Sequence, residues 1–308
     1  MKQKLTIAVC TYNRKKILEE CLQSLQEQTV PLTAFSVLII DNNSTDNTRE
    51  FVDSLQKTWL GLRYVFEKNQ GLSHARNHAL AETATEWLAF LDDDAKAHAD
   101  WVATILETIG KEDFGAFGGP YYAWHRFGPA PKWLPEEFAV YTGQTYYGEL
   151  TPGEAYIPGG NCAFNTLAAR QAGGFPVDMG MTGGKCAYGE EDFFFRKLAS
   201  NGVRLGFVPE MKIDHCVLPY KYKLSWQLYA QYAHGKAWMR LESDFSLKRL
   251  IKLFVKLGVF LVLAPCLFFQ TWCTTKYWQK GLIRVGASVN WLSGACLAGI
   301  VRLFNKKI

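Results

Sequence analysis

Short apolar runs alternate with segments of helical periodicity over the N-terminal third of the chain. Four of these runs are rich in β-branched or aromatic residues, which is typical of buried strands. They lie at residues 5–10, 35–40, 62–66 and 87–91. Apolar residues also recur at three- and four-residue spacing over about residues 17–25, which predicts an amphipathic helix. A second helix is expected at about residues 73–83.

Strands that alternate with helices predict an α/β domain with a largely parallel sheet. In such sheets the ligand lies in the loops at the carboxyl ends of the strands. Three of the four predicted strands end in polar residues, namely Thr11, Asp41 and the run Asp92–Asp94. We therefore expect the functional site at this edge of the sheet.

Residues 119–158 are rich in Gly, Pro and aromatic side chains and show little periodicity. Aromatic rings offer flat faces on which sugar rings can stack, whereas hydrophobic filling of the core is the structural alternative. We interpret this segment as an ordered region that faces the substrate.

Two uncharged apolar stretches follow near the C-terminus, at residues 257–275 and 285–301. Each lies at the lower edge of the about 17–25 residues that a spanning helix needs. The pattern allows a tight transmembrane hairpin, two helices lying in the membrane interface, or a soluble helical hairpin packed on the body.

The distribution of charge favours a membrane for this segment. Residues 246–308 contain ten Lys or Arg and no Asp or Glu, whereas the chain as a whole carries a net charge of +5. A basic, apolar segment joined to a mildly acidic body predicts contact with an anionic membrane. The same imbalance argues against general nucleic-acid binding.

Eight cysteines are scattered along the chain without a C-x-x-C pair, and several lie in apolar runs. This pattern predicts free thiols in a reducing compartment. No apolar stretch of signal-peptide form precedes Thr11. Together these features predict a catalytic body in the cytoplasm, held on the cytoplasmic face of the inner membrane by the C-terminal segment.

The strongest chemical signal is the run Asp92-Asp93-Asp94 at the end of the fourth predicted strand. Adjacent carboxylates repel one another unless a cation neutralises them. Oxygen ligands favour Mg²⁺ or Mn²⁺, and such ions commonly bridge to substrate phosphates. A solvated acidic turn is the structural alternative.

Five further motifs accompany the aspartates, in a fixed order. The six are Val9-Cys10-Thr11-Tyr12-Asn13-Arg14, Ile39-Ile40-Asp41-Asn42-Asn43-Ser44-Thr45-Asp46, Asn69-Gln70-Gly71-Leu72-Ser73-His74-Ala75-Arg76-Asn77, Leu91-Asp92-Asp93-Asp94, Pro158-Gly159-Gly160-Asn161 and Gly189-Glu190-Glu191-Asp192. In order and spacing they resemble the family 2 glycosyltransferases, over roughly residues 4–240. The resemblance implies the GT-A fold, a Rossmann-like, mostly parallel sheet that binds a nucleotide-diphosphate sugar.

The resemblance also implies a set of residues that bind the donor nucleotide. This set is Thr11, Tyr12, Asn13, Asp41, Arg76, Asp92 and Asp93. Within it, Asp41 would accept a hydrogen bond from a base N–H and Arg76 would donate one to a base carbonyl, which favours a UDP-sugar. Asp92 would face the ribose. A capping residue and a surface charge are the structural alternatives for Asp41 and Arg76.

For the cofactor, the resemblance implies that Asp94 binds Mn²⁺ or Mg²⁺ and that His215 completes the metal site. A lone histidine is also commonly structural. Gly159, Gly160 and Asn161 would approach the sugar or the acceptor, with Asn161 donating to a sugar hydroxyl; a tight turn is the alternative.

The acidic motif Glu190-Glu191-Asp192 matches the family position that supplies the general base. The common form is Glu-Asp-x-Asp, and this chain departs from it. Glu191 and Asp192 fit the Glu-Asp pair, which makes Asp192 the base. Counting back from Arg196 instead makes Glu190 the base, although an acid in a first helical turn also suits capping.

The chain is therefore expected to be a metal-dependent, inverting glycosyltransferase that builds polysaccharide or glycolipid. Its acceptor would be a lipid-linked or polysaccharide hydroxyl. We expect a glycosyltransferase domain over residues 1–245, with a nucleotide-sugar half at 1–118 and an acceptor half at 119–245, and membrane-associated helices at 246–308.

Two other functions fit parts of the pattern. A nucleotidyltransferase also joins an α/β fold to metal-binding carboxylates, but the loop after the first predicted strand lacks the glycines that cradle a triphosphate. A sugar-binding membrane scaffold with a decayed site is disfavoured by the intact Asp92–Asp94 run and the acidic motif.

Overall fold

The computed structural model describes residues 3–111, 113–144, 146–151, 156–183, 185–242 and 246–305. Its elements fall into two compact units. The sheet unit consists of Met1–Trp124, Ala139–Gly183 and Glu190–Cys216. The helical unit consists of His125–Phe138, Gly184–Gly189 and Val217–Ile308. The functional division expected from the sequence, at residues 118 and 245, stays a prediction.

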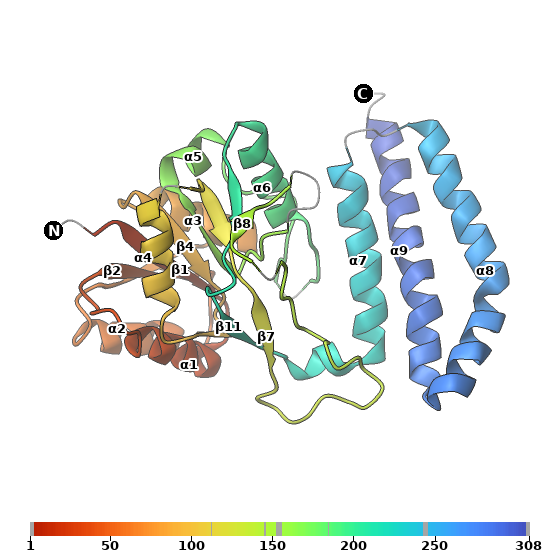
Figure 1. The fold of residues 1–308 in the computed structure, drawn as a ribbon, viewed down its shortest axis with the longest axis horizontal. Coiled ribbons are helices and arrows are strands. Elements are labelled where there is room, and N and C mark those ends of the chain that lie inside the picture. Colours follow the sequence, from red (N-terminus) through yellow and green to blue (C-terminus); the bar gives the residue numbers. More distant parts are fainter. Residues whose placement is uncertain are drawn as a thin grey trace. The chain divides into compact units, whose positions relative to one another are not determined.

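The sheet unit is built on an eight-stranded mixed sheet of order β3-β2-β1-β4-β9-β6-β10-β8 (Figure 1). Its strands are β1 (Leu5–Thr11), β2 (Phe35–Asp41), β3 (Leu62–Phe66), β4 (Trp87–Leu91), β6 (Ala116–Gly118), β8 (Gly148–Glu149), β9 (Asn161–Asn165) and β10 (Leu205–Phe207). The first four run parallel, which confirms the four predicted strands. β9 runs antiparallel to both neighbours, β4 and β6.

Helices cover both faces of this sheet (Figure 1). They are α1 (Lys15–Gln26), α2 (Thr48–Gln56), α3 (Leu72–Glu82), α4 (Trp101–Lys111), α5 (Thr166–Gln171) and α6 (Glu190–Ser200). Ile7 and Val9 of β1 join one hydrophobic cluster with residues of α1 and α4, whereas Ala8 joins a second cluster with residues of α3 and α6. Burial on both faces explains why β1, β2 and β4 are predominantly apolar and do not alternate, whereas β3, at the end of the strand order, is more exposed.

A separate three-stranded sheet has the order β5-β11-β7. Its strands are β5 (Ala95–Ala97), β11 (Ile213–Cys216) and β7 (Tyr121–Trp124). β5 begins directly after the aspartate run, and His215 pairs with Ala95 across the ladder. The backbone N–H of Cys216 donates to the carbonyl of Asp94 at 2.7 Å. This small sheet therefore holds a histidine beside an aspartate more than a hundred residues earlier in the chain.

The helical unit contains the short 3₁₀ helix η1 (Pro219–Tyr222) and three long helices. These are α7 (Leu224–Leu241), α8 (Leu247–Thr275) and α9 (Trp278–Asn305). Met239, Leu253, Leu292, Ala295 and Cys296 form their shared core. Both predicted apolar stretches lie inside α8 and α9. Among the described helices, α8 alone is long and apolar enough to cross a membrane.

Candidate active site

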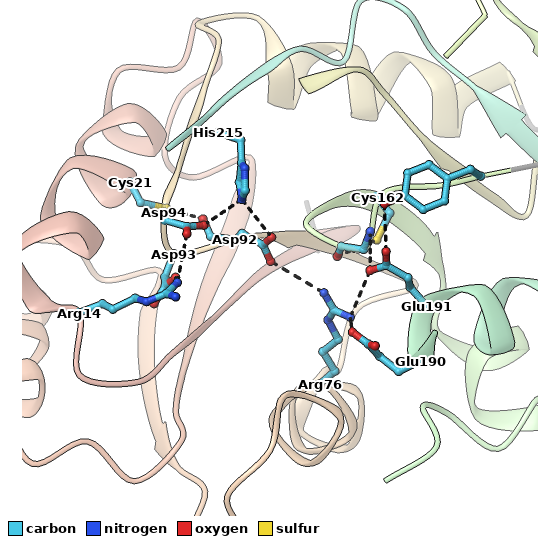
Figure 2. A network of polar contacts seen from close by, with 12 residues as sticks. Arg14, Cys21, Arg76, Asp92, Asp93, Asp94, Cys162, Glu190, Glu191 and His215 are labelled. Carbon is cyan, nitrogen blue, oxygen red and sulfur yellow. Dashed lines mark hydrogen bonds and ion pairs between the residues drawn. The ribbon is translucent and has the colours of Figure 1, made fainter. Parts of the chain in front are cut away.

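The aspartate run follows β4, and its three side chains have different surroundings (Figure 2). The Asp92 side chain is 36% exposed, whereas Asp93 and Asp94 are buried. Asp93 accepts hydrogen bonds from the Thr11 hydroxyl at 2.8 Å and from Arg14 Nη1 at 2.9 Å. The same Arg14 nitrogen lies 3.1 Å from Asp94 Oδ2. One guanidinium thus bridges the two buried carboxylates.

Burial raises the pKa of Asp93 to about 6, with Arg14 opposing the rise and Asp94 adding to it. Two buried carboxylates next to each other favour a cation, because each one disfavours the charged form of the other. Arg14 supplies part of that positive charge. The sequence pattern contained Arg14 in a motif but gave it no role, since its partners lie about eighty residues further along the chain.

Asp92, Asp94 and His215 form a cluster that could hold a metal ion, with one ligand atom from each lying within 4.8 Å of the others. His215 Nε2 is 3.1 Å from Asp94 Oδ1 and 3.8 Å from Asp92 Oδ2. Two carboxylates and one imidazole suit a hard or borderline divalent cation such as Mn²⁺. Because Asp92 and His215 are partly exposed, the cluster is also open to solvent. The residues present therefore fit a divalent ion.

Among the described residues, the group that could hold a metal ion contains no cysteine. Burial raises the pKa of Cys162 to about 12 and that of Cys21 well above its usual value. A thiol must lose its proton to bind a metal or to act as a nucleophile. All eight cysteines lie in the described part of the chain and are free, as predicted.

A second polar group surrounds Arg76 of α3, which is almost completely buried (Figure 2). Its Nη1 is 3.1 Å from Glu190 Oε1 and 3.7 Å from Glu191 Oε2, and its Nη2 is 3.8 Å from Asp92 Oδ1. Burial opposes the charge, but Glu190, Glu191 and Asp92 together raise the pKa of Arg76, so the guanidinium stays positive. Asp92 thus belongs to the candidate metal cluster and also contacts Arg76, which in turn contacts the acidic motif.

The three acids of the motif open α6, where the positive end of the helix favours negative charge. Glu190 is buried against Arg76. Glu191 accepts from the Tyr156 hydroxyl at 3.0 Å and from the Gly159 N–H at 3.1 Å. Burial and the neighbouring Glu190 raise its pKa to about 8.

Asp192 differs from both glutamates. Its side chain is half-buried, and burial raises its pKa while Arg196 lowers it. Within the described residues, Asp192 has neither a hydrogen bond nor an ion pair that would occupy its carboxylate. Of the three acids, it is therefore the one whose carboxylate is open to an incoming proton.

Gly159 and Gly160 allow close approach between the two polar groups. A Cβ at Gly159 would collide with Glu191 Oε2 and the Arg76 guanidinium, and a Cβ at Gly160 would collide with the Asp92 carboxylate. A side chain at either position would therefore displace Glu191 and Arg76, or Asp92, from the contacts described above.

Asn161 has a different role from the one expected. Its Oδ1 accepts from Trp101 Nε1 at 2.8 Å, and its Nδ2 donates to the carbonyls of Pro120 and Met211, both at 2.8 Å. The residue is 0% exposed. With its amide buried and fully hydrogen-bonded, the structure gives Asn161 a framework role in place of the expected sugar contact.

The expected nucleotide residues divide into two groups. Asn13 has a positive φ of 53° and joins the loop that follows Asp41, because its Oδ1 accepts from the Thr45 N–H at 2.7 Å. Asp41 is buried and accepts from the Tyr64 hydroxyl at 2.7 Å. Thr11, the partly exposed Tyr12, Asn13 and Asp41 thus lie at adjacent strand ends. Arg76 is directed towards the acidic motif.

A model of the family described as "Glycosyl transferase family 2" matches residues 6–171, which is more than half of the chain. The chain belongs to glycosyl transferase family 2. The predicted membership is confirmed, and the protein is a glycosyltransferase.

Two relatives match most of this family 2 chain. Succinoglycan biosynthesis protein ExoM from Rhizobium meliloti is 30% identical over 249 residues, covering 78% of this chain and 75% of the relative. Glucosyl-dolichyl phosphate glucuronosyltransferase from Haloferax volcanii is 25% identical over 242 residues and covers 75% of each chain.

Among solved structures, mannosyltransferase PcManGT from Pyrobaculum calidifontis, in complex with GDP-Man and Mn²⁺, has a TM-score of 0.67. It is 21% identical, and the match covers 97% of this chain and 88% of that one. This likeness shows the GT-A fold, which confirms the predicted fold class.

Sequence reasoning missed three residues around this glycosyltransferase site: Arg14, Tyr156 and Trp101. Each one is recognisable only through a partner far along the chain, such as Glu191 for Tyr156. A tyrosine in the aromatic 119–158 segment was the available signal for Tyr156, but that segment has no periodicity that would single it out.

Proposed function

We propose that the enzyme is a metal-dependent, inverting glycosyltransferase that takes its sugar from a nucleotide-diphosphate donor. The main support for this proposal is that two clusters of polar side chains, the candidate metal cluster and the acidic motif with Arg76, lie next to each other at one edge of the sheet. The cluster of Asp92, Asp94 and His215 suits a cation, and Asp92 also faces Arg76, which contacts the acidic motif. A site that combines a cation cluster with an adjacent carboxylate base has both parts that displacement of a nucleoside diphosphate needs.

Asp94 and His215, with Asp92 beside them, would hold Mn²⁺ or Mg²⁺. When bound, the ion would act as a Lewis acid that stabilises the negative charge on the departing diphosphate. Arg14 holds the two buried carboxylates in place from the other side. The Mn²⁺ in the complex of PcManGT supports this cofactor.

Asp192 is the proposed general base. Its carboxylate would take the proton from the acceptor hydroxyl as that oxygen attacks the anomeric carbon. The bond from that carbon to the diphosphate breaks in the same step, with its electron pair leaving on the nucleoside diphosphate. One displacement inverts the anomeric configuration. Glu190 is a weaker candidate, because its carboxylate is paired with Arg76.

For the donor we propose a UDP-sugar, held by the strand-end set of Thr11, Tyr12, Asn13 and Asp41, with Asp93 supporting Thr11. Asp41 would accept a hydrogen bond from an N–H of the nucleobase. Arg76 would donate a hydrogen bond to a carbonyl of the nucleobase after its ion pair with Glu190 has opened. The similar structure of PcManGT is in complex with GDP-Man, so a comparison of UDP with GDP tests the choice of nucleobase directly.

For the acceptor we propose a lipid-linked or polysaccharide hydroxyl at the cytoplasmic face of a membrane. One relative is named for succinoglycan biosynthesis and the other for a glucosyl-dolichyl phosphate substrate, which supports this class of acceptor. The apolar helix α8 supports the membrane location.

A thermal-shift screen of nucleoside diphosphates and nucleotide sugars, with and without Mn²⁺, tests the proposal. A ligand that binds the folded state raises the apparent melting temperature. We expect UDP with Mn²⁺ to stabilise the enzyme more than UDP alone. Stronger stabilisation by GDP would overturn the choice of base, and no stabilisation by any nucleotide would overturn the proposed donor class.

A further inference from the structure

The surface of α8 is exposed and apolar along much of the helix. Its exposed large apolar side chains include Val255, Val259, Leu261, Val262, Phe269 and Trp272. Apolar surface in water costs about 25 cal/mol for each Å², so a contiguous face of this kind marks a contact site. Lys248, Lys252 and Lys256 recur every four residues at the start of the helix and are exposed. Charge and apolarity together point to an anionic lipid surface as the partner.

α8 could either cross the membrane or lie within one leaflet. The position of the first turns of α9 distinguishes these two arrangements, because α9 follows directly after α8. Lys280, Ile283 and Arg284 of α9 line a pocket of about 260 Å³ together with Trp133 and Pro135. The beginning of α9 thus lies against the segment His125–Phe138.

The segment His125–Phe138 is a short part of the helical unit, because the chain belongs to the sheet unit again from Ala139. Pro135 is only four residues before Ala139. A fully extended chain spans at most about 3.6 Å per residue, so Pro135 lies within about 15 Å of Ala139. The hydrocarbon core of a bilayer is about 30 Å thick. The turn between α8 and α9 is therefore on the same side of the bilayer as residue 139.

The opposite ends of α8 and α9 are tied to the end of α7. Arg249 of α8 forms an ion pair with Glu242 at 2.7 Å. Arg302 of α9 donates to the carbonyl of Met239 at 3.0 Å and to that of Glu242. If α8 crossed the bilayer, its first turn and the end of α7 would lie on the side opposite to residue 139. Because α7 starts shortly after the sheet unit ends at Cys216, α7 would then have to cross the bilayer as well.

The composition of α7 does not allow a crossing. It carries His234, Lys236 and Arg240, and it lacks the apolar length that identifies α8. A charged side chain at the centre of a spanning helix costs about 2.5–3.5 kcal/mol on insertion scales. Both ends of α8 consequently belong on one side of the membrane.

We propose that α8 lies in the plane of the interface and that the helical unit enters one leaflet of an anionic phospholipid membrane without crossing it. The proposal rests on the membrane association proposed above and adds its geometry. Trp133, Trp272 and Trp278 suit the headgroup level, where tryptophan is enriched. An acceptor lipid in the same leaflet is then presented from the side on which the enzyme binds.

Labelling with a membrane-impermeant maleimide tests this geometry in sealed membrane vesicles of both orientations. Lys276→Cys reports on the exposed turn between α8 and α9, and Leu60→Cys, 96% exposed in the sheet unit, is the reference. Peptide mass spectrometry separates the two positions from the native cysteines. We expect both positions to be labelled in the same vesicle orientation and protected in the other. Labelling of the two positions from opposite sides would overturn the in-plane geometry.

Flotation of the full-length protein with vesicles of phosphatidylglycerol and phosphatidylethanolamine separates this inference from the one it rests on. Flotation together with same-side labelling supports both. Flotation with opposite-side labelling would support membrane association and contradict the in-plane geometry. A protein that stays at the bottom of the gradient would contradict membrane association and therefore the in-plane geometry as well.

Discussion

At the scale of single residues, neighbouring acids in this site differ because their partners differ. Asp93 and Asp94 are buried and share Arg14, whereas Asp92 is partly exposed and faces both His215 and Arg76. The same separation occurs along Glu190, Glu191 and Asp192. Such differences let adjacent carboxylates take on separate tasks in one reaction.

Replacement of the proposed base provides the first test. Asp192→Asn keeps the shape of the side chain and removes its basicity, so kcat should fall by about 10²–10⁴-fold. Binding of UDP should change little, because the base acts on the acceptor. Glu190→Gln is the matched control. Full activity in Asp192→Asn, with an inactive Glu190→Gln, would transfer the role to Glu190.

The metal site gives a second prediction. Asp94→Asn should abolish the extra stabilisation that Mn²⁺ adds to UDP in the thermal screen, because it removes a charged ligand from a cluster of three. Transfer activity should be lost with it. The control is Asp214→Asn, which changes an acid on the same strand as His215 but outside the cluster. An unchanged Mn²⁺ effect in Asp94→Asn would refute the assignment.

Glu191 makes the stability of the fold depend on pH. Burial and the neighbouring Glu190 raise the pKa of Glu191 from 4.5 to about 8. Between these two pH values, Glu191 is protonated in the folded state and ionised in the unfolded state. Its contribution to stability is complete below pH 4.5 and is lost as the pH rises towards about 8. Chemical denaturation at several pH values should show this loss in the wild type and not in Glu191→Gln. Parallel pH profiles in the two proteins would contradict it.

From the sequence, Asp94 and His215 were expected to bind the metal and Asp92 to face the ribose, whereas the supporting residues were not expected. The structure brings all three side chains together in one group that could hold a metal ion, whereas the assignment of each role stays a prediction. The framework contacts of Asn161 were not expected, because its three partners, Trp101, Pro120 and Met211, come from three other segments of the chain and no local sequence pattern indicates them. Hydrogen bonds between distant segments leave no periodic signal in the sequence.

At the scale of elements, the strands buried on both faces were predictable and the short ones were not. β1, β2 and β4 are predominantly apolar and buried, β3 is shorter and partly exposed, and the structure places all four within one residue of the predicted bounds. β5, β7 and β11 have only three or four residues, too few for a periodic pattern. Their pairing nevertheless fixes the position of His215.

The basic start of α8 supports a prediction at this scale. Replacing Lys248, Lys252 and Lys256 together by Gln should weaken flotation with anionic vesicles, since each charge contributes about 1 kcal/mol at best. The effect should shrink as salt rises. A triple replacement of Lys57, Lys68 and Lys197 by Gln in the sheet unit changes the net charge equally and should leave flotation unaltered. Equal loss in both triples would show that net charge, and not α8, governs binding.

At the scale of the whole molecule, the residues of the proposed active site and those of the proposed membrane contact lie in different units. The polar clusters that we assign to donor, cation and base all lie in the sheet unit. The exposed apolar surface of α8 lies in the helical unit. From the charge distribution, the sequence predicts a division between residues 1–245 and 246–308, and this division stays a prediction. The sequence did not predict that α7 and residues 125–138 join α8 and α9, because those contacts are made in space between distant segments.

The central claim is that the Asp92, Asp94 and His215 cluster uses a divalent ion to transfer a sugar from a nucleotide donor. The most direct measurement is release of nucleoside diphosphate from a panel of nucleotide sugars, with a membrane extract as acceptor, in Mn²⁺ and in excess chelator. We expect release with a UDP-sugar in Mn²⁺, its loss on chelation, its recovery when Mn²⁺ is restored, and no release from Asp94→Asn. Release that continues undiminished in chelator, or equally from Asp94→Asn, would contradict a metal-dependent transfer at this cluster.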